Sequence, residues 1–381
     1  MKILWTTKLT NETCHKTSEF EMSEELRKKG HDVTIIMAKK IGQNISENNK
    51  NIYLPTFDLI FFSGFIFGLI IFFYLPILSW KKKIDVIIID EATVWLPFVI
   101  TLKLLRFPLI LDIRTLPIDK EKSTAFDIAL HLSKYVVDGL TTITPELEKI
   151  LKKKYNLQNK KIGIWTSGVS IKKFTKVSTI NEKIKSLRDT NPFILMYHGT
   201  YSTTRGIENL IESLEKLEID IRKKIMLIMI GLSPDEEKYL MYLCEKFSVQ
   251  KQVKFFPKVE YDEIPSYISM SDVGVYPLPP DNIWWYVSAP LKTLEYLAMS
   301  KPVIVTNIPF HKRIFEKGEC GVILDTNTPK ELANAIKYMF ENKEKLVTMG
   351  KNGKEIVEKY HTWEHEASNL ERFLYSIFER K

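Results

Sequence analysis

Short apolar runs that alternate with amphipathic stretches recur along almost the whole chain. The runs IDVIIID (84–90) and FPLILDIR (107–114) are nearly continuous apolar segments, which is typical of parallel strands covered on both faces. Stretches with helical periodicity lie between such runs, as in RGIENLIESLEKL (205–217). Because strands that alternate with helices form doubly wound parallel sheets, the sequence predicts an α/β fold.

The alternating pattern begins twice, which indicates two domains in a chain of 381 residues. It begins with MKILWTT at the N-terminus and again with PFILMYHG (192–199), and the polar segment 176–191 between the two halves is the expected linker. We therefore expect one Rossmann-like domain over 1–178 and a second over 179–355. In such sheets ligands bind at the carboxyl ends of the strands, where helices begin.

Composition limits the kinds of partner. The formal net charge is +8, which suits an anionic partner such as a nucleotide or an anionic membrane surface. Lysine and arginine are spread widely, and we expect no nucleic-acid partner. The three cysteines, Cys14, Cys244 and Cys320, show no ligand spacing, which argues for a reducing compartment and against a disulfide or zinc framework. We expect neither a metal site nor a cofactor.

The stretch SAPLKTLEYLAMSKPVIVTN (288–307) predicts a helix that begins near Pro290 and Leu291 and is followed by a buried strand. The N-terminus of a helix offers unpaired N–H groups and the positive end of the helix dipole, so it can bind an anion. Lys292 adds a full positive charge there, and Glu295 could accept hydrogen bonds from paired sugar hydroxyls. The alternative is a surface ion pair between Lys292 and Glu295.

The turn HGTYSTTRG (198–206) follows the first strand of the same half. Gly199 allows close backbone approach and Arg205 opens the next helix, so both turns can converge on one diphosphate. We interpret Arg205 and Lys292 as catalytic through charge stabilisation, although Arg205 could also be a solvated residue. The expected donor-binding residues are Gly199, Thr200, Pro290, Leu291, Thr293 and Glu295, with Pro257 and Lys258 near the base.

The second half resembles the nucleotide-sugar-binding domain of GT-B glycosyltransferases, in particular the retaining glycosyltransferase family four. The resemblance rests on Ser288, Pro290, Lys292, Glu295 and Tyr296, on Lys-Pro-Val-Ile at 301–304, and on the turn TSGVSIKKF (166–174). It implies two Rossmann-like domains facing across a cleft, with a terminal helix at 356–381 that crosses back to the first domain. It also implies metal-independent sugar transfer with retention, with a nucleoside diphosphate sugar as donor.

The chain departs from the family pattern at three places. Val287 stands where the family often has a second glutamate, and Thr200 stands where it often has an arginine. The glycine-rich loop after the first strand is replaced by TTKLTNETCHKTSEF (6–20). The acceptor side therefore cannot be transferred from the family. The candidates there are His15, Arg114 and His198, and His198 could equally be a satisfied core residue.

Residues 59–80 carry no charge and are followed by Lys81, Lys82 and Lys83. The segment is long enough to span a bilayer, but a single crossing would put two parts of one sheet on opposite sides of the membrane. It could be a helix pair in the core. We favour a patch inserted into the membrane face, with the lysines on anionic headgroups, so that the protein is cytoplasmic and peripherally attached to the inner face of the cell membrane.

The sequence as a whole predicts a glycosyltransferase that moves a sugar from a nucleoside diphosphate sugar to a lipid-linked or glycan acceptor in cell-surface glycan synthesis. A sugar-nucleotide epimerase of the same fold is one alternative. A degenerate, non-catalytic membrane subunit is another, and Val287 and Thr200 lend it some weight.

Overall fold

The computed structural model describes residues 1–7, 17–40, 51–56, 63–90, 100–117, 120–175, 185–186, 188–189 and 193–378. The chain divides into two compact units. Unit 1 consists of Met1–Ser167 and Trp363–Lys381, and unit 2 consists of Gly168–Thr362. Each unit is built on one parallel sheet.

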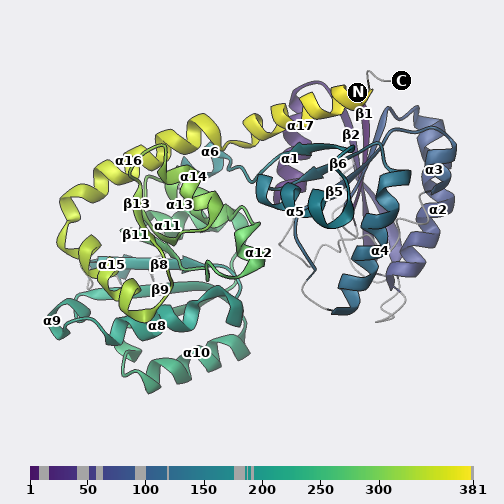
Figure 1. The fold of residues 1–381 in the computed structure, drawn as a ribbon. Helices are drawn as coiled ribbons and strands as arrows, with labels where there is room; N and C mark the ends of the chain where they lie inside the picture. The colour runs from purple at the N-terminus through teal and green to yellow at the C-terminus, as the bar shows by residue number, and fades with distance from the viewer. Residues whose placement is uncertain are drawn as a thin grey trace. The chain divides into compact units, whose positions relative to one another are not determined.

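Unit 1 has a seven-stranded sheet in the order β3-β2-β1-β4-β5-β6-β7. Figure 1 shows α1 and α17 on one face of this sheet and α2 and α3 on the other. The strands are β1 Lys2–Thr7, β2 Asp32–Lys40, β3 Asn51–Thr56, β4 Val86–Ile89, β5 Leu109–Ile113, β6 Gly139–Thr142 and β7 Lys161–Ile164. The helices are α1 Thr17–Lys28, α2 Ser63–Lys82, α3 Ile100–Leu104, α4 Lys120–Val136, α5 Pro145–Tyr155 and α17 Trp363–Phe378.

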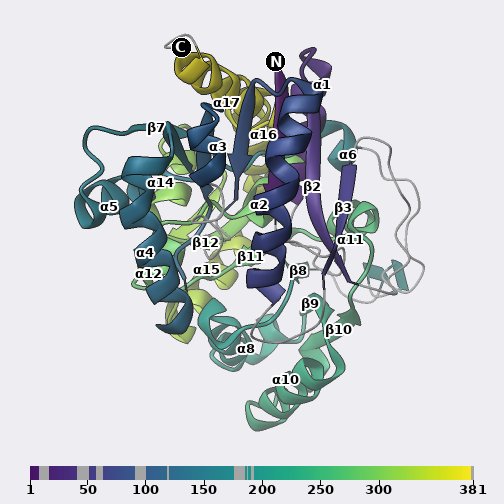
Figure 2. The ribbon, with the colours of Figure 1, turned by 90° about the vertical axis from the view of Figure 1, so that its right-hand side faces the viewer.

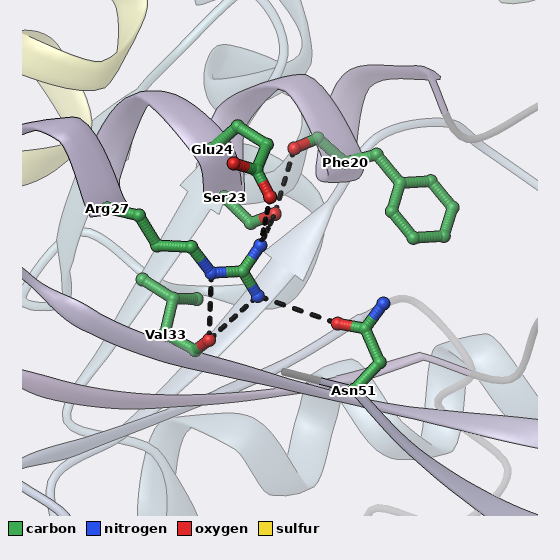
Figure 3. Close-up of polar contacts among 6 residues, drawn as sticks. All are labelled: Phe20, Ser23, Glu24, Arg27, Val33 and Asn51. Carbon is green, nitrogen blue, oxygen red and sulfur yellow. Dashed lines mark hydrogen bonds and ion pairs between the residues drawn. The ribbon is translucent and has the colours of Figure 1, made fainter. Parts of the chain in front are cut away.

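Arg27, in the last turn of α1, forms hydrogen bonds to residues of two strands (Figure 3). Its Nε and Nη2 donate to the carbonyl oxygen of Val33 in β2, at 3.1 and 2.8 Å, and Nη2 also reaches Asn51 in β3 at 3.5 Å. Its Nη1 is paired with Glu24 on the same helix. The planar guanidinium thus spans three elements at once, which a lysine could not do.

Helix α17 packs on α1 and β7. Near α1, the Glu371 carboxylate lies 2.7 Å from the ring of His31 and 3.1 Å from Lys29 Nζ. Near β7, the Phe373 ring lies over Gly163, where an added Cβ would come within 2.4 Å of the ring. Gly163 therefore lets this helix approach the sheet, as does Gly139 of β6, where an added Cβ would lie 2.9 Å from both Phe373 and Ile377.

Unit 2 has a six-stranded sheet in the order β10-β9-β8-β11-β12-β13. Figure 1 shows α8 and α10 on one face of this sheet and α11 and α13 on the other. The strands are β8 Phe193–His198, β9 Ile225–Leu232, β10 Val253–Pro257, β11 Val273–Tyr276, β12 Val303–Thr306 and β13 Gly321–Leu324. The helices are α6 Ile171–Thr175, η2 Thr203–Arg205, α8 Ile207–Glu215, α9 Ile219–Arg222, α10 Pro234–Lys246, η3 Gln250–Gln252, η4 Tyr261–Glu263, α11 Ile264–Ser269, α12 Ile283–Tyr286, α13 Leu291–Ala298, α14 Pro309–Phe315, α15 Pro329–Glu341 and α16 Lys343–Tyr360.

Both sheets wind outwards in two directions from their first strand. In unit 1 the strand order reverses between β1 and β4, and in unit 2 it reverses between β8 and β11. The predicted α/β class with two doubly wound parallel sheets is confirmed. Connections leave such a reversal point in opposite directions, so the carboxyl ends of β8 and β11 are the expected place for a ligand of unit 2.

The boundaries between the units differ from those expected. The sequence suggested a boundary at 178/179, whereas the structure has it between Ser167 and Gly168. The reason is packing, because α6 contacts α11 and α13 of unit 2 and Phe174 is buried there. Helix α16 also packs on α13, so the terminal segment of unit 1 begins at Trp363 rather than at 356.

The uncharged segment 59–80 falls mostly in α2, while residues 59–62 lie outside the described part of the chain. Ile71, Leu75 and Leu78 on one face of α2 are buried, and the helix packs against β3 and α3. Figure 2 shows α2 in front of the strands of unit 1. Across the described residues, we find no helix with the length and apolar composition needed to cross a membrane.

We expect Gly163→Ala to destabilise unit 1, because its Cβ would overlap the Phe373 ring. Overpacking of this kind costs about 1–3 kcal/mol, which urea unfolding would measure, and faster hydrogen exchange in α17 would localise the effect. Adding Phe373→Ala should make the combined loss smaller than the sum of the two single losses. Full additivity would show that the ring does not depend on Gly163.

Candidate functional site

The turn after β8 brings the backbone of Gly199 against the side chain of Lys292 from α13. Gly199 has a φ of +121°, and an added Cβ would lie 2.1 Å from Lys292 Cε and 2.8 Å from Nζ. Its N–H donates to the carbonyl of Ile230 in β9 at 2.8 Å. The positive φ requires glycine at this position, and a Cβ there would also displace the end of the Lys292 side chain.

Helix α13 begins at Leu291 after Pro290, and no side chain caps its N-terminus. Its first N–H groups thus have no capping acceptor, and the helix dipole is positive there. The hydroxyl of Thr293 does not face this end, because it is bonded to His311 Nε2 at 2.9 Å. His311 Nδ1 lies 2.8 Å from the Thr306 carbonyl, and burial lowers the pKa of His311 to about 4, so Thr293 can offer a ligand only its backbone N–H.

Arg205 ends the short helix η2 and is held by aromatic side chains. Its Nη1 donates to the Tyr276 hydroxyl at 2.8 Å, and its Cζ lies 5.1 Å from the centre of the Trp285 ring. Trp285 is fixed in turn by a bond from Nε1 to the Thr204 carbonyl, 2.5 Å long. Tyr276, followed by Tyr197, raises the pKa of Arg205 against the effect of burial, so the guanidinium stays charged.

Tyr276, at the end of β11, is where the two cations come together. Lys292 Nζ lies 5.4 Å from the centre of its ring, while Arg205 bonds its hydroxyl. The Tyr276 ring stacks on Tyr197 of β8, 5.9 Å between centres. Within the described part of the chain, neither cation forms an ion pair with a carboxylate. Two positive charges without such a counter-ion, together with an uncapped helix N-terminus, are the features that an anion-binding site requires.

Glu295 lies one turn further along α13 and is 3% exposed. Its Oε1 accepts a hydrogen bond of 2.8 Å from the Tyr261 hydroxyl. Its Oε2 is 3.2 Å from His198 Nε2, but the two atoms are not aligned for a hydrogen bond. Burial raises the pKa of Glu295, and Lys292 and Tyr261 act in the opposite direction. Burial, helped by Lys292, lowers the pKa of His198 well below its usual range, so this ring is neutral.

The structure therefore brings together Gly199, Arg205, Lys292, Glu295 and His198 in unit 2. His198, a candidate for the acceptor side, lies at the end of β8 beside Glu295. The carbonyl of Thr200 accepts from the Tyr197 hydroxyl at 3.1 Å. Pro257 and Lys258 are exposed at the end of β10. Tyr261, three residues later, is the residue of this loop that contacts Glu295, and no motif in the sequence pointed to it.

Arg114, in unit 1, follows β5 and is engaged in structural contacts. Its Nη1 donates to the Trp165 carbonyl at 2.7 Å, and its Cζ lies 3.5 Å from the centre of the Trp165 ring. Nearby, Asp112 accepts from Thr141 and from Trp165 Nε1, and burial raises the pKa of Asp112 to about 6. Arg114 thus joins β5 to the end of β7. His15 lies outside the described residues.

Among the described residues there is no group of three or more histidine, cysteine, aspartate or glutamate side chains that could hold a metal ion.

Two family models match the chain. Residues 178–356 match the model described as Glycosyl transferases group 1, and residues 17–173 match the model described as Glycosyltransferase Family 4. The first match contains the whole cluster around Tyr276, from Gly199 to Glu295. Together the two matches extend over most of the chain.

The chain is similar to several curated glycosyltransferases. It is 26% identical over 224 residues to D-inositol 3-phosphate glycosyltransferase of Paenarthrobacter aurescens, covering 57% of this chain and 53% of the relative. It is 25% identical over 174 residues to a GDP-mannose-dependent phosphatidylinositol monomannoside mannosyltransferase of Mycobacterium tuberculosis, covering 45% and 44%. The chain spans about half the length of the curated relatives it matches.

Among solved structures, the Anabaena protein HepE in complex with UDP superposes with a TM-score of 0.70 at 15% identity, covering 99% of this chain and all of that one. At this identity the likeness shows the fold, which is GT-B.

We expect inorganic pyrophosphate to raise the melting temperature of the protein, because an anion bound between Arg205 and Lys292 stabilises the folded state. Gly199→Ala should abolish most of this rise, since its Cβ would displace Lys292 and its φ would be strained. Gly318→Ala is the control, because its Cβ would meet only the tip of Ile356 at 3.3 Å. An equal pyrophosphate response in all three proteins would place the anion elsewhere.

Proposed function

The chain is a group 1 glycosyltransferase of GT-B fold, and from this premise we propose that it transfers a sugar from a nucleoside diphosphate sugar to a lipid-linked acceptor at a membrane surface. The observation that carries the donor half of this proposal is the meeting of Arg205 and Lys292 at Tyr276. The complex of HepE with UDP supports a nucleotide in the same fold. The exposed apolar face of α2 supports the second part of the proposal, which is that the acceptor lies at a membrane surface.

In the proposed reaction the bond between sugar C1 and the oxygen of the β-phosphate breaks, and a bond from the acceptor oxygen to C1 forms. The acceptor hydroxyl loses its proton, which the departing diphosphate takes up. Negative charge grows on the diphosphate as the first bond breaks. Arg205, Lys292 and the N–H groups of α13 stabilise that charge more in the transition state than in the bound substrate, which lowers the barrier.

In this proposal Glu295 binds the ribose of the nucleotide. A carboxylate with two oxygens can accept from both hydroxyls of a ribose, as acidic residues do in dinucleotide-binding folds. Glu295 lies one turn beyond Lys292, so diphosphate and ribose would both be held by α13. The loop after β10 is then the natural neighbour of the base, because its Tyr261 already touches Glu295.

We expect Lys292→Ala to lower kcat/KM for the donor by about 100-fold to 1,000-fold, the usual cost of removing one group that stabilises developing negative charge. Release of nucleoside diphosphate from a panel of UDP-sugars and GDP-sugars, with polyprenyl diphosphate sugars as acceptors, measures this. Lys330→Ala is a matched control, since Lys330 is also the second residue of a unit 2 helix but is exposed and outside the site.

Three outcomes would contradict the proposed reaction. Unchanged turnover in Lys292→Ala would remove Lys292 from the mechanism. Interconversion of one sugar nucleotide into another without diphosphate release would indicate an epimerase. Nucleotide binding with no turnover on any donor would indicate a non-catalytic subunit.

The outward face of α2 carries large apolar side chains along one line. Leu69, Phe73, Ile77 and Trp80 recur at helical spacing and are 42%, 62%, 66% and 83% exposed. Since the opposite face is buried against the sheet, the helix is apolar on both sides, which is unusual for a helix at a water-facing surface. Leu104 and Leu105, at the end of the adjoining α3, are also exposed. We name these six side chains the apolar ridge.

Basic residues stand at the end of the apolar ridge. Lys81 and Lys82 end α2 and Lys83 follows it, and all three are exposed. An apolar strip that ends in lysines suits an anionic lipid surface, where the apolar groups enter the boundary of the acyl region and each lysine contributes about 1 kcal/mol. A lipid-linked acceptor would then reach the enzyme without leaving the membrane.

We expect Phe73→Ser, Ile77→Ser and Trp80→Ser together to release the protein from vesicles that contain phosphatidylglycerol, measured by sedimentation. The fold should survive because these side chains are largely exposed. Transfer to a short water-soluble acceptor should also survive. A matched control is Met241→Ser with Tyr242→Ser, which removes exposed apolar groups from α10 of unit 2. If the parent protein never sediments with these vesicles, the membrane half of the proposal is wrong.

A further inference from the structure

Tyr261 joins the loop after β10 to helix α13 through a hydrogen bond. It opens η4, directly beyond the exposed Pro257 and Lys258, and its hydroxyl donates to Glu295 Oε1 at 2.8 Å. Glu295 is 3% exposed, so water can solvate its carboxylate very little. A buried carboxylate depends on hydrogen bonds from the protein. The Tyr261 hydroxyl supplies one of these bonds to Glu295.

Two residues of α6 contact the Tyr261 ring. Phe174, which is buried, meets the ring edge-on with 5.8 Å between centres, and Lys173 Nζ lies 5.8 Å from the ring centre. Helix α6 itself packs on α11 and α13. A tyrosine fixed in this way presents its hydroxyl at a set position, so it is a preorganised donor.

The charged and titratable groups around Glu295 come from four elements. Lys292 lies on the same helix, and the neutral His198 lies at the end of β8 with Nε2 3.2 Å from Oε2. Tyr261 comes from η4, and Lys173 of α6 faces the Tyr261 ring. Tyr296, next to Glu295, has its hydroxyl bonded to the carbonyl of Met196 in β8 at 2.9 Å.

Tyr261 and His198 thus approach different oxygens of the same carboxylate. Tyr261 makes an aligned hydrogen bond to Oε1, whereas His198 lies near Oε2 without one. A carboxylate bound firmly at one oxygen keeps a fixed orientation, and the remaining lone pairs of both oxygens can still accept from a ligand.

We propose that Tyr261 is a positioning residue that fixes the Glu295 carboxylate for the two ribose hydroxyls of the donor nucleotide. This inference rests on the proposed function, since it assigns Glu295 to the ribose. It gives the loop after β10 a defined task that does not involve reading the base. It also explains why α6, which begins unit 2, packs against a residue of that loop.

The hydrogen bond from Tyr261 has a consequence for pH. It stabilises the ionised carboxylate and so lowers the pKa of Glu295, against the larger effect of burial, which raises it. The ionised form accepts hydroxyl bonds best, so nucleotide binding is present above this pKa and is lost as the pH falls through it. Without the Tyr261 hydroxyl the pKa rises further, and binding is lost at a higher pH.

The test compares the protein with its Tyr261→Phe variant, using UDP and GDP as probes and calorimetric titration from pH 5 to 9. We expect the acid midpoint of binding to move up by about one pH unit, the size expected for one hydrogen bond to a charged group. In turnover assays KM for the donor should rise about tenfold near the midpoint while kcat changes little. Loss of packing alone would weaken binding equally at every pH and would not move the midpoint.

Tyr155→Phe is the matched control, because Tyr155 also donates its hydroxyl to a carboxylate, Asp127, but lies in unit 1. It should leave the midpoint unchanged, and Glu295→Gln should remove the acid limb of binding. An unchanged midpoint in Tyr261→Phe would overturn the inference. Tighter binding by Tyr261→Phe would also overturn it, since the hydroxyl would then compete with the ribose. If the parent protein binds neither UDP nor GDP, the proposed function itself fails.

Discussion

Parallel strands that wind outwards from β8 in both directions impose the constraint on which the site of unit 2 depends. The connection after β8 runs towards β9, while the connection after β11 runs towards β12. Only at this reversal can two neighbouring loops separate and leave the strand ends open. Gly199 and Arg205 follow one of these strands and Tyr276 ends the other. The groups that meet at Tyr276 therefore derive from the topology of the sheet.

Aromatic side chains hold the cations of this site in place of carboxylates. Arg205 donates a hydrogen bond to the Tyr276 hydroxyl and lies over the Trp285 ring. Lys292 lies over the Tyr276 ring and against Gly199. An aromatic face attracts a cation without neutralising it. The arrangement keeps both positive charges available for an anionic ligand, and a salt bridge to aspartate or glutamate would have reduced that attraction. Glu295, the carboxylate of the site, is directed instead towards Tyr261 and His198.

Helix α2 of unit 1 exposes large apolar side chains. The helix buries one face on the sheet and presents a second apolar face outwards, with lysines at its end. A core needs only the first of these faces. Among the described residues, the side chains of the second face are largely exposed. An anionic lipid surface, as proposed, would match both its apolar and its basic part.

The sequence by itself determined the α/β class, the two sheets, and the helix that begins at Leu291 with Lys292 and Glu295 on it. These features follow from local patterns, because apolar periodicity and the positions of proline and glycine act over a few residues. It also indicated that Gly199 and Arg205 follow the strand β8.

Only the tertiary structure decided that Arg205 and Lys292 meet at Tyr276, that Thr293 faces His311, and that Tyr261 reaches Glu295. It also moved the boundary of unit 2 from 178 to 167, because α6 packs on α11 and α13. Such contacts join residues far apart in the chain through packing of whole elements, and no local pattern encodes them.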